Sequence, residues 1–139
     1  IADTIHVNKG LFQFVINNKG KNKLILITDS MEAGGLEDGE YSLGGQKVIV
    51  KDNAARLENG ALAGSVSALN SMVRNFYNNT DLTVVEAINL ASLNPATAIH
   101  VADKKGSIEI GKDADFALFD DDFNCSMTIC TGDIVFERK

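Results

Sequence analysis

The spacing of apolar residues changes along the chain, and one run has no polar position at all. Residues 24–27 are Leu, Ile, Leu and Ile. Such a run has no solvent face, so it predicts a strand covered on both sides, as in a parallel sheet. Residues 1–7 are rich in β-branched side chains and predict a second strand. Residues 9–18 between them predict a helix, which completes a strand–helix–strand unit.

The next segment has a different pattern. Between residues 41 and 57, short apolar runs are separated by Gly44-Gly45 and by Asp52-Asn53. Turn residues at these intervals predict a small antiparallel meander.

From Ser65 onward the apolar positions recur every three or four residues, which predicts a helix with Ser65 as its N-cap. Thr83 and Glu86 fit a capping box at the start of a second helix. Asn94-Pro95 predicts a third, short helix, with Asn94 as N-cap, that ends near His100.

The last part of the chain predicts β-structure at residues 107–110, 116–119, 127–131 and 134–136, with Gly132-Asp133 as a hairpin turn. These elements do not close a sheet around the strand at residues 24–28. We therefore expect its parallel neighbours in sequence upstream of Ile1, which would make the chain a fragment of a longer one.

Composition narrows the class of protein. The chain has 139 residues, 45% of them hydrophobic, and a formal net charge of −6. This charge disfavours a nucleic-acid or anionic-membrane surface, and no apolar run reaches the ~20 residues of a membrane span. Cys125 and Cys130 would point to opposite faces of a strand. We expect free thiols and a cytoplasmic location.

Asp29 follows the buried run directly, at the carboxyl end of a predicted parallel strand, where α/β barrels carry their catalytic residues. His6 ends the preceding strand and would share that rim. The pair could transfer protons or contact an anionic substrate. The alternatives are that Asp29 caps a turn and that His6 is a hydrogen-bonded structural histidine; His100 is interpreted as structural.

Two further groups of residues could bind a ligand or a metal, but each also has a purely structural interpretation. Ala63-Gly64-Ser65 would allow close backbone approach to an anion or a carbonyl at a helix start, or would be a simple N-cap. The tail is rich in aspartates that we interpret as solvated turn residues: Asp113, Asp115, Asp120, Asp121 and Asp122. With two distant histidines and no His-x-His, the chain does not form a full metal site by itself.

The order of these pieces resembles the C-terminal third of the N-acetylglucosamine-6-phosphate deacetylases, a family of the amidohydrolase superfamily. The segments that carry the resemblance are Ile1-Ala-Asp-Thr-Ile-His-Val7, Leu26-Ile-Thr-Asp-Ser-Met31, Asp38-Gly-Glu-Tyr-Ser-Leu-Gly-Gly45, Leu62-Ala-Gly-Ser65, Ala91-Ser-Leu-Asn-Pro-Ala96 and Lys105-Gly-Ser-Ile-Glu-Ile-Gly-Lys-Asp-Ala-Asp115.

The resemblance implies an α/β fold: the last two strand–helix units of a (β/α)8 TIM-type barrel, with part of a small β domain. Residues 1–102 would belong to the barrel, with a meander insert at 40–58, and residues 103–139 to the small domain. The implied full-length enzyme hydrolyses N-acetylglucosamine 6-phosphate to glucosamine 6-phosphate and acetate, in amino-sugar catabolism. Its divalent metal, zinc or iron, is held by ligands absent from this chain, so we expect the chain alone to be inactive.

The resemblance also implies roles for single residues. Asp29 would be the general base toward the metal-bound water and would return the proton to the leaving amine. His6 would contact the sugar phosphate or a nearby hydroxyl, and the backbone of Leu62, Ala63 and Gly64 would face the sugar. One departure is Thr4, where glycine is common in the family.

The partners implied are a small amino-sugar phosphate and, for the full-length enzyme, one or more further subunits; no nucleic acid or membrane is expected. The exposed barrel edges of the isolated chain predict self-association. Two rival functions stay open: another amidohydrolase acting on cyclic amides, in the manner of dihydroorotases, or a stand-alone, non-catalytic β/helix module.

Overall fold

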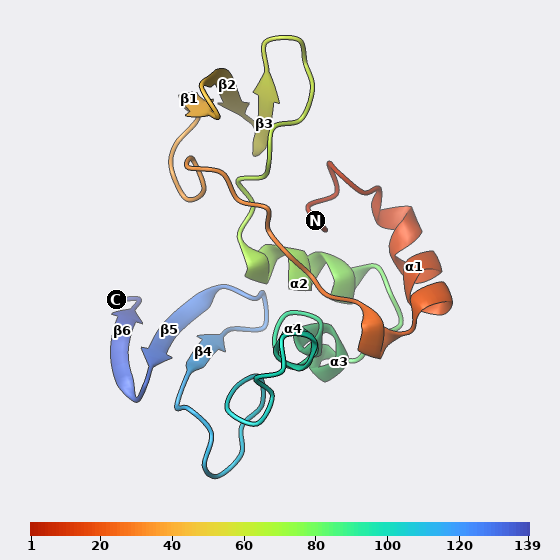
Figure 1. Cartoon of the computed structure of the whole chain (residues 1–139), viewed down its shortest axis with the longest axis vertical. Coiled ribbons are helices and arrows are strands. Elements are labelled where there is room, and N and C mark those ends of the chain that lie inside the picture. The colour runs from red at the N-terminus through yellow and green to blue at the C-terminus, as the bar shows by residue number, and fades with distance from the viewer.

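A computed structural model describes residues 1–139, with four α-helices and two three-stranded antiparallel sheets (Figure 1). The helices are α1 (Phe12–Lys19), α2 (Leu69–Asn78), α3 (Val84–Asn89) and α4 (Leu93–Ala98). The first sheet contains β1 (Gly39–Leu43), β2 (Gln46–Lys51) and β3 (Ala54–Leu57); the second contains β4 (Phe116–Phe119), β5 (Cys125–Cys130) and β6 (Asp133–Glu137). Short 3-10 helices, η1 (Lys9–Leu11) and η2 (Lys21–Lys23), flank α1.

The predicted meander is confirmed as the sheet β1-β2-β3. Its strands pair antiparallel in chain order, with Val48 opposite both Tyr41 and Leu57. Val48 and Val50 alternate with exposed residues along β2, so one face of the sheet is buried. That face forms a small core with Ala55 of β3 and with Met31, Ala33 and Ala63, which come from the segments entering and leaving the meander.

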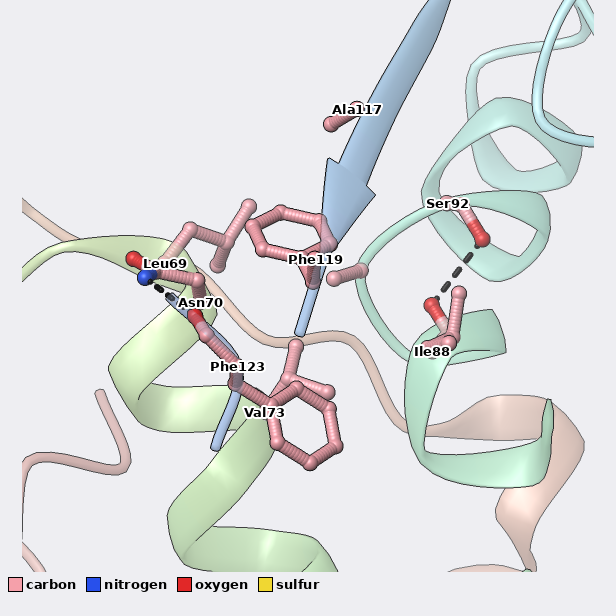
Figure 2. Close-up of a pocket in the computed structure, with 9 residues that line it drawn as sticks. Leu69, Asn70, Val73, Ile88, Ser92, Ala117, Phe119 and Phe123 are labelled. Carbon is pink, nitrogen blue, oxygen red and sulfur yellow. Dashed lines mark hydrogen bonds between the residues drawn. The ribbon is translucent and has the colours of Figure 1, made fainter. Parts of the chain in front are cut away.

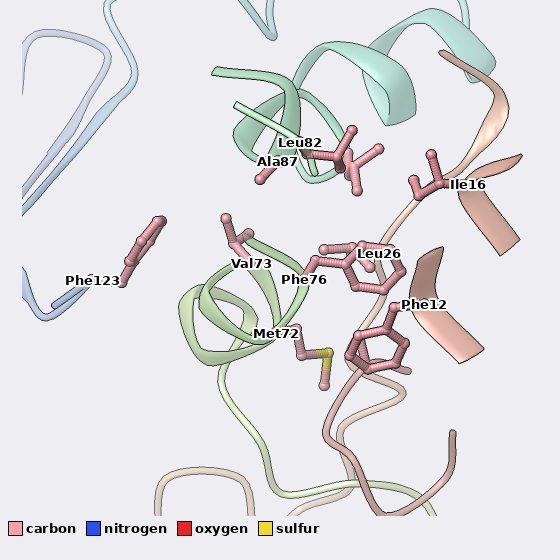
Figure 3. Packing of buried hydrophobic residues seen from close by; sticks show 11 residues of the cluster. Phe12, Ile16, Leu26, Met72, Val73, Phe76, Leu82, Ala87 and Phe123 are labelled. Carbon is pink, nitrogen blue, oxygen red and sulfur yellow. The ribbon is translucent and has the colours of Figure 1, made fainter. Parts of the chain in front are cut away.

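A second core joins the helices (Figure 3). The rings of Phe12 on α1 and Phe76 on α2 stack with centroids 4.4 Å apart and planes 13° from parallel. Met72, Leu82 and Leu90 are buried around them. The helix predicted for residues 9–18 is thus confirmed, because packing of its apolar side on α2 offsets its short length.

The helix starts follow the sequence only in part. The capping box of α3 is confirmed: Thr83 Oγ1 accepts from the Glu86 amide, and Glu86 accepts from the Thr83 amide at 2.8 Å. Helix α2 starts at Leu69 instead of near Ser65, since Ser65 is extended and pairs elsewhere. Asn94 is not a cap; its side-chain amide donates to the carbonyls of Lys21 and Leu24, each at 2.7 Å.

The two parallel strands predicted for the start of the chain are absent from the structure. Residues 24–28 are extended but pair with no strand, and their one backbone bond within that run joins the Leu26 amide to the Leu90 carbonyl. Leu26 is buried, whereas Ile25 and Ile27 are 36% and 56% exposed. A strand of a parallel sheet requires at least one parallel neighbour, and both sheets of this chain are antiparallel and lie elsewhere. The chain therefore contains no barrel unit of its own.

Residues 1–7 fold into turns for a local reason. Thr4 has φ +71°, outside the strand region, and the Asp3 carboxylate accepts hydrogen bonds from the amides of Ile5 and His6. Residues 107–110 also form no strand, and Ile108 and Ile110 are exposed there.

The predicted C-terminal hairpin is confirmed, one residue earlier than expected. Cys130 pairs with Asp133, which leaves Thr131 and Gly132 as the turn, both with positive φ. The link from β4 to β5 docks on α2, where the Asn70 side-chain amide donates to the Phe123 carbonyl at 2.9 Å. Both cysteines are free.

The chain exposes more surface than its size requires. Its accessible area is 8931 Å², whereas a compact monomer of this mass exposes about 7,000 Å². Part of the difference is large apolar side chains, including Phe14, Ile27 and Val135. No helix of the chain has the length and apolar character that a membrane span requires.

Candidate active site

Asp29 lies where two connecting segments run side by side between the helices and the meander. One segment leads from η2 to β1 and the other from β3 to α2 (Figure 1). They are joined by a parallel bridge between Ser30 and Ser65. The Ser65 amide donates to the Asp29 carbonyl, and the Met31 amide donates to the Ser65 carbonyl, both at 2.9 Å. The backbone around Asp29 is therefore held from both sides.

The side chain of Asp29 is left free by this arrangement. Asp29 has φ +49°, a left-handed conformation that aspartate tolerates better than most residues. The residue is exposed, and no hydrogen bond within the chain uses its carboxylate. The alternative that this carboxylate caps a turn is thus wrong, and the group is available to an outside partner.

The loop of Leu62, Ala63 and Gly64 passes directly against the Asp29 backbone. The Ala63 amide donates to the Ala55 carbonyl at 3.0 Å, which ties the loop to β3. Gly64 has φ +69°, and a Cβ there would lie 3.0 Å from the Asp29 carbonyl oxygen. Neither the N–H nor the C=O of Gly64 has a hydrogen-bond partner within the chain.

The same geometry corrects the expectation of a helix start at this loop. Helix α2 begins five residues after Gly64, with Ala68 as N-cap and no side-chain cap. The Ser65 hydroxyl instead accepts from the Ser67 amide at 2.9 Å and is buried. Helix-terminal amides are therefore not what the Gly64 loop offers to a ligand.

His6 lies in the N-terminal turn, paired with a residue that the sequence interpretation did not single out. Its Nδ1 is 2.8 Å from Oδ2 of Asp3, which is only 7% exposed. The signal available in the sequence was the spacing, an aspartate three residues before a histidine. No hydrogen bond of the chain links this turn to the Asp29 loop, so the structure fixes two separate pieces of the candidate site.

The pKa of Asp3 is lowered by the groups that hydrogen-bond to its carboxylate. Burial acts to raise the pKa of its carboxyl group, but the hydrogen bonds from the His6 amide, the His6 ring and the Ile5 amide outweigh burial. The pKa of Asp3 is therefore held below its ordinary value, and the group is a carboxylate at neutral pH.

A complete metal centre does not fit the residues of this chain. No group of three or more His, Cys, Asp or Glu side chains is placed to hold a metal ion. Three aspartates of the tail have other partners: Asp113 and Asp115 pair with Lys105, and Asp120 accepts from the amides of Asp122 and Asn124. His100 is exposed after α4, with no side-chain hydrogen bond.

An apolar cavity of about 260 Å³ lies between α2, α3 and β4 (Figure 2). Its two polar side chains are already occupied, since Asn70 donates to the Phe123 carbonyl and Ser92 to the Ile88 carbonyl. No titratable side chain lines it. The cavity thus lacks groups for acid–base chemistry, and the candidate site is the surface at Asp29.

Comparison with known proteins gives consistent matches over almost the whole chain. The model of the amidohydrolase family matches residues 15–135. The chain is 42% identical over 139 residues to N-acetylglucosamine-6-phosphate deacetylase of Bacillus subtilis, covering 100% of this chain and 35% of that protein. It is 38% identical over 120 residues to a putative N-acetylgalactosamine-6-phosphate deacetylase of Escherichia coli K12, covering 86% of this chain and 71% of that protein.

Solved structures agree. The crystal structure of N-acetylglucosamine-6-phosphate deacetylase from Thermotoga maritima matches with a TM-score of 0.91 at 38% identity, over 99% of this chain and 38% of that one. A Mycobacterium smegmatis deacetylase in complex with N-acetyl-D-glucosamine-6-phosphate matches with a TM-score of 0.87 at 27% identity, over 96% and 36%. The chain thus spans about a third of the length of the Bacillus subtilis, Thermotoga maritima and Mycobacterium smegmatis proteins.

Proposed function

The chain belongs to the amidohydrolase family and is a homologue of the N-acetylglucosamine-6-phosphate deacetylases, and from this premise we propose that the protein containing it is such a deacetylase. The reaction cleaves the amide C–N bond of N-acetylglucosamine 6-phosphate and gives glucosamine 6-phosphate and acetate. The resemblance identified in the sequence is confirmed at the level of the family and of these homologues. The observation that carries the proposal is the match over the whole chain at 42% identity.

We assign proton transfer to Asp29. An attacking water must lose a proton as it adds to the acetamide carbonyl, and the leaving amine must gain one as the C–N bond breaks. A carboxylate that is exposed, fixed through its backbone and unused within the chain can accept the first proton and deliver the second. Asp29 has these properties.

We assign substrate binding to His6 and to the loop of Leu62, Ala63 and Gly64. The imidazole would contact the 6-phosphate or a neighbouring hydroxyl. The free N–H and C=O of Gly64 would face the sugar, since polar backbone groups without internal partners need an external one when substrate covers them.

The remaining parts would come from outside these 139 residues. We propose that residues 24–28 occupy a strand position of a (β/α)8 barrel whose neighbouring strands lie elsewhere, that residues 1–102 belong to this barrel, and that residues 103–139 belong to a small β domain. The family is typically metal-dependent, and the ligands for a zinc or iron ion would lie in the same missing part. We expect the 139 residues alone to be inactive.

The test is a substrate comparison with the full-length protein that contains this chain. N-acetylglucosamine 6-phosphate, N-acetylgalactosamine 6-phosphate and a cyclic amide such as dihydroorotate are assayed for amine or acid release. The galactosamine substrate is a second candidate because two Escherichia coli relatives at 38% identity carry that name. We expect the highest kcat/KM for the glucosamine substrate; turnover of the cyclic amide alone would refute the proposal.

A further inference from the structure

Asp3 and His6 form a carboxylate–imidazole pair in which Asp3 is buried and His6 is partly exposed. The Asp3 side chain is 2% exposed and the His6 side chain 20% exposed. One edge of the imidazole, at Nδ1, meets the carboxylate at 2.8 Å. Nε2 has no hydrogen-bond partner within the chain. Nδ1 of His6 is therefore occupied by Asp3, and Nε2 is free to contact a ligand.

The carboxylate itself is fixed by the backbone around it. Oδ1 accepts from the Ile5 amide at 3.0 Å and from the His6 amide at 2.9 Å, so Oδ2 remains for the imidazole. The preceding residue is anchored to α2, because the Asn75 side-chain amide donates to the Ala2 carbonyl at 2.9 Å. Asp3 is thus a rigid acceptor, and the ring of His6 must adapt to it.

A carboxylate opposite Nδ1 decides where the imidazole carries its proton. An ionised aspartate can only accept hydrogen bonds, so Nδ1 must be the donor. In the neutral ring this places the lone pair on Nε2, and in the charged ring Nε2 becomes a second donor. In both states the hydrogen bond sets the orientation of the ring and turns Nε2 away from Asp3.

We propose that Asp3 is the positioning residue of the substrate site: it fixes the orientation and the Nδ1–H tautomer of His6, so that Nε2 is presented to the phosphate or a hydroxyl of the substrate. This assignment rests on the proposed function, which gives His6 the substrate contact. Asp3 itself is buried and acts only through His6.

The first test is the tautomer of His6, measured by long-range 1H–15N NMR on the 139-residue chain under conditions where the ring is neutral. The chain has two histidines, and His100, which has no side-chain partner, is the internal reference. We expect His6 to be protonated at Nδ1. In Asp3→Asn the side-chain oxygen of Asn can still accept from the amides of Ile5 and His6, and its Nδ2 then donates to Nδ1 of His6. We therefore expect the ring proton of His6 on Nε2 in this variant. Protonation of the wild-type ring at Nε2 would overturn the proposal.

The second test is a double-mutant cycle on KM in the full-length enzyme. We expect Asp3→Asn to raise KM for N-acetylglucosamine 6-phosphate about tenfold, at the low end of the effects of removing a carboxylate that orients a binding histidine, with a smaller change in kcat. In a His6→Ala background the same substitution should leave KM unchanged. A tenfold effect that persists without His6 would show that Asp3 merely stabilises the turn, and would overturn the positioning role.

The two tests distinguish a failure of the positioning role of Asp3 from a failure of the proposed deacetylase function. A full-length protein that turns over none of the amino-sugar phosphates fails the proposed function. The tautomer measurement needs no substrate, so in that case it still decides whether Asp3 sets the state of His6.

Discussion

The backbone amide of Ser65 donates a hydrogen bond of 2.9 Å to the carbonyl oxygen of Asp29. The two residues are far apart in sequence, and this bond, together with the bond from the Met31 amide to the Ser65 carbonyl, holds the segment before the meander against the segment after it. The position of the Asp29 carboxylate therefore depends on the loop that ends at Ser65. Gly64 is the residue on which that approach depends most directly.

Gly64→Ala should destabilise the chain. The new Cβ would lie 3.0 Å from the Asp29 carbonyl oxygen and 3.3 Å from the Met31 Cβ, at a φ of +69°. The left-handed conformation costs a non-glycine residue about 1–2 kcal/mol, and the forced shift adds about 1–3 kcal/mol. Denaturant unfolding of the 139-residue chain measures the loss.

Gly60→Ala is the matched control for this substitution. Gly60 has φ +86° in the turn before the same loop, but nothing lies within 4 Å of the position that its Cβ would take. It should lose only the backbone contribution of about 1–2 kcal/mol. Equal losses in the two variants would show that the approach of Gly64 to Asp29 is not tight.

Asp29→Asn should remove most turnover from the full-length enzyme, because an amide cannot accept and return the proton. Positioned acid–base groups contribute about 10²–10⁴-fold to rate, so kcat should fall at least 100-fold while KM changes little. Asp52→Asn is the control, since Asp52 is another exposed aspartate with positive φ, in the turn between β2 and β3. Retention of full kcat by Asp29→Asn would refute the catalytic role.

Thr4→Gly should stabilise the chain by about 0.5–1 kcal/mol. A β-branched residue at φ +71° carries about 1–2 kcal/mol of strain, and glycine removes it at a smaller cost in chain entropy. Thr97→Gly should have the opposite sign, since Thr97 lies in helix α4, where glycine is the less favourable residue (about 1 kcal/mol below alanine, and more weakly favoured than threonine). A melting temperature that falls for Thr4→Gly would contradict the strain argument.

Local rules predict the elements whose causes are local. The capping box of Thr83 and Glu86 lies within four residues, and the meander and the last hairpin follow from turn residues beside them. The failures at residues 24–28 and at Asn94 have non-local causes, whereas the strand predicted for residues 1–7 is replaced by turns with a local cause. The side chains of residues 24–28 are suited to burial. Whether this run becomes a strand depends on neighbouring strands, and these are not determined by the run itself. The sequence predicts Asn94 as a cap, whereas its partners are the distant carbonyls of Lys21 and Leu24.

The candidate site, too, is predicted from the sequence only in part. The pattern locates Asp29 after the aliphatic run, but its left-handed conformation and the close approach of Gly64 are visible only in the folded chain. The sequence does not single out Asp3, because its turn requires the positive φ of Thr4, and a β-branched residue favours a strand instead. The residue roles assigned by resemblance to Asp29, His6 and the Leu62–Gly64 loop stay predictions.

The contribution of Asp3 to stability should depend on pH. Its pKa is lower in the folded chain than the ordinary 3.8, so the folded state binds fewer protons than the unfolded state in that range. The stabilisation is therefore present above the ordinary pKa and is lost as the pH falls through 3.8 toward the folded pKa. The difference in unfolding free energy between wild type and Asp3→Asn, measured by urea unfolding from pH 6 down to about pH 2, should shrink on acidification. A difference that stays constant would contradict it.

The isolated chain should self-associate through the unpaired segment at residues 24–28. Its backbone has unused hydrogen-bonding groups and Ile27 is 56% exposed, which makes the segment an open edge for strand pairing. Light scattering coupled to size exclusion should give a mass above that of the monomer, rising with concentration. Ile27→Lys places a charge on this edge and should shift the distribution toward monomer. Ile110→Lys removes a similar exposed side chain outside the edge and should not. A wild-type chain that stays monomeric at all concentrations would show that this edge does not pair in solution.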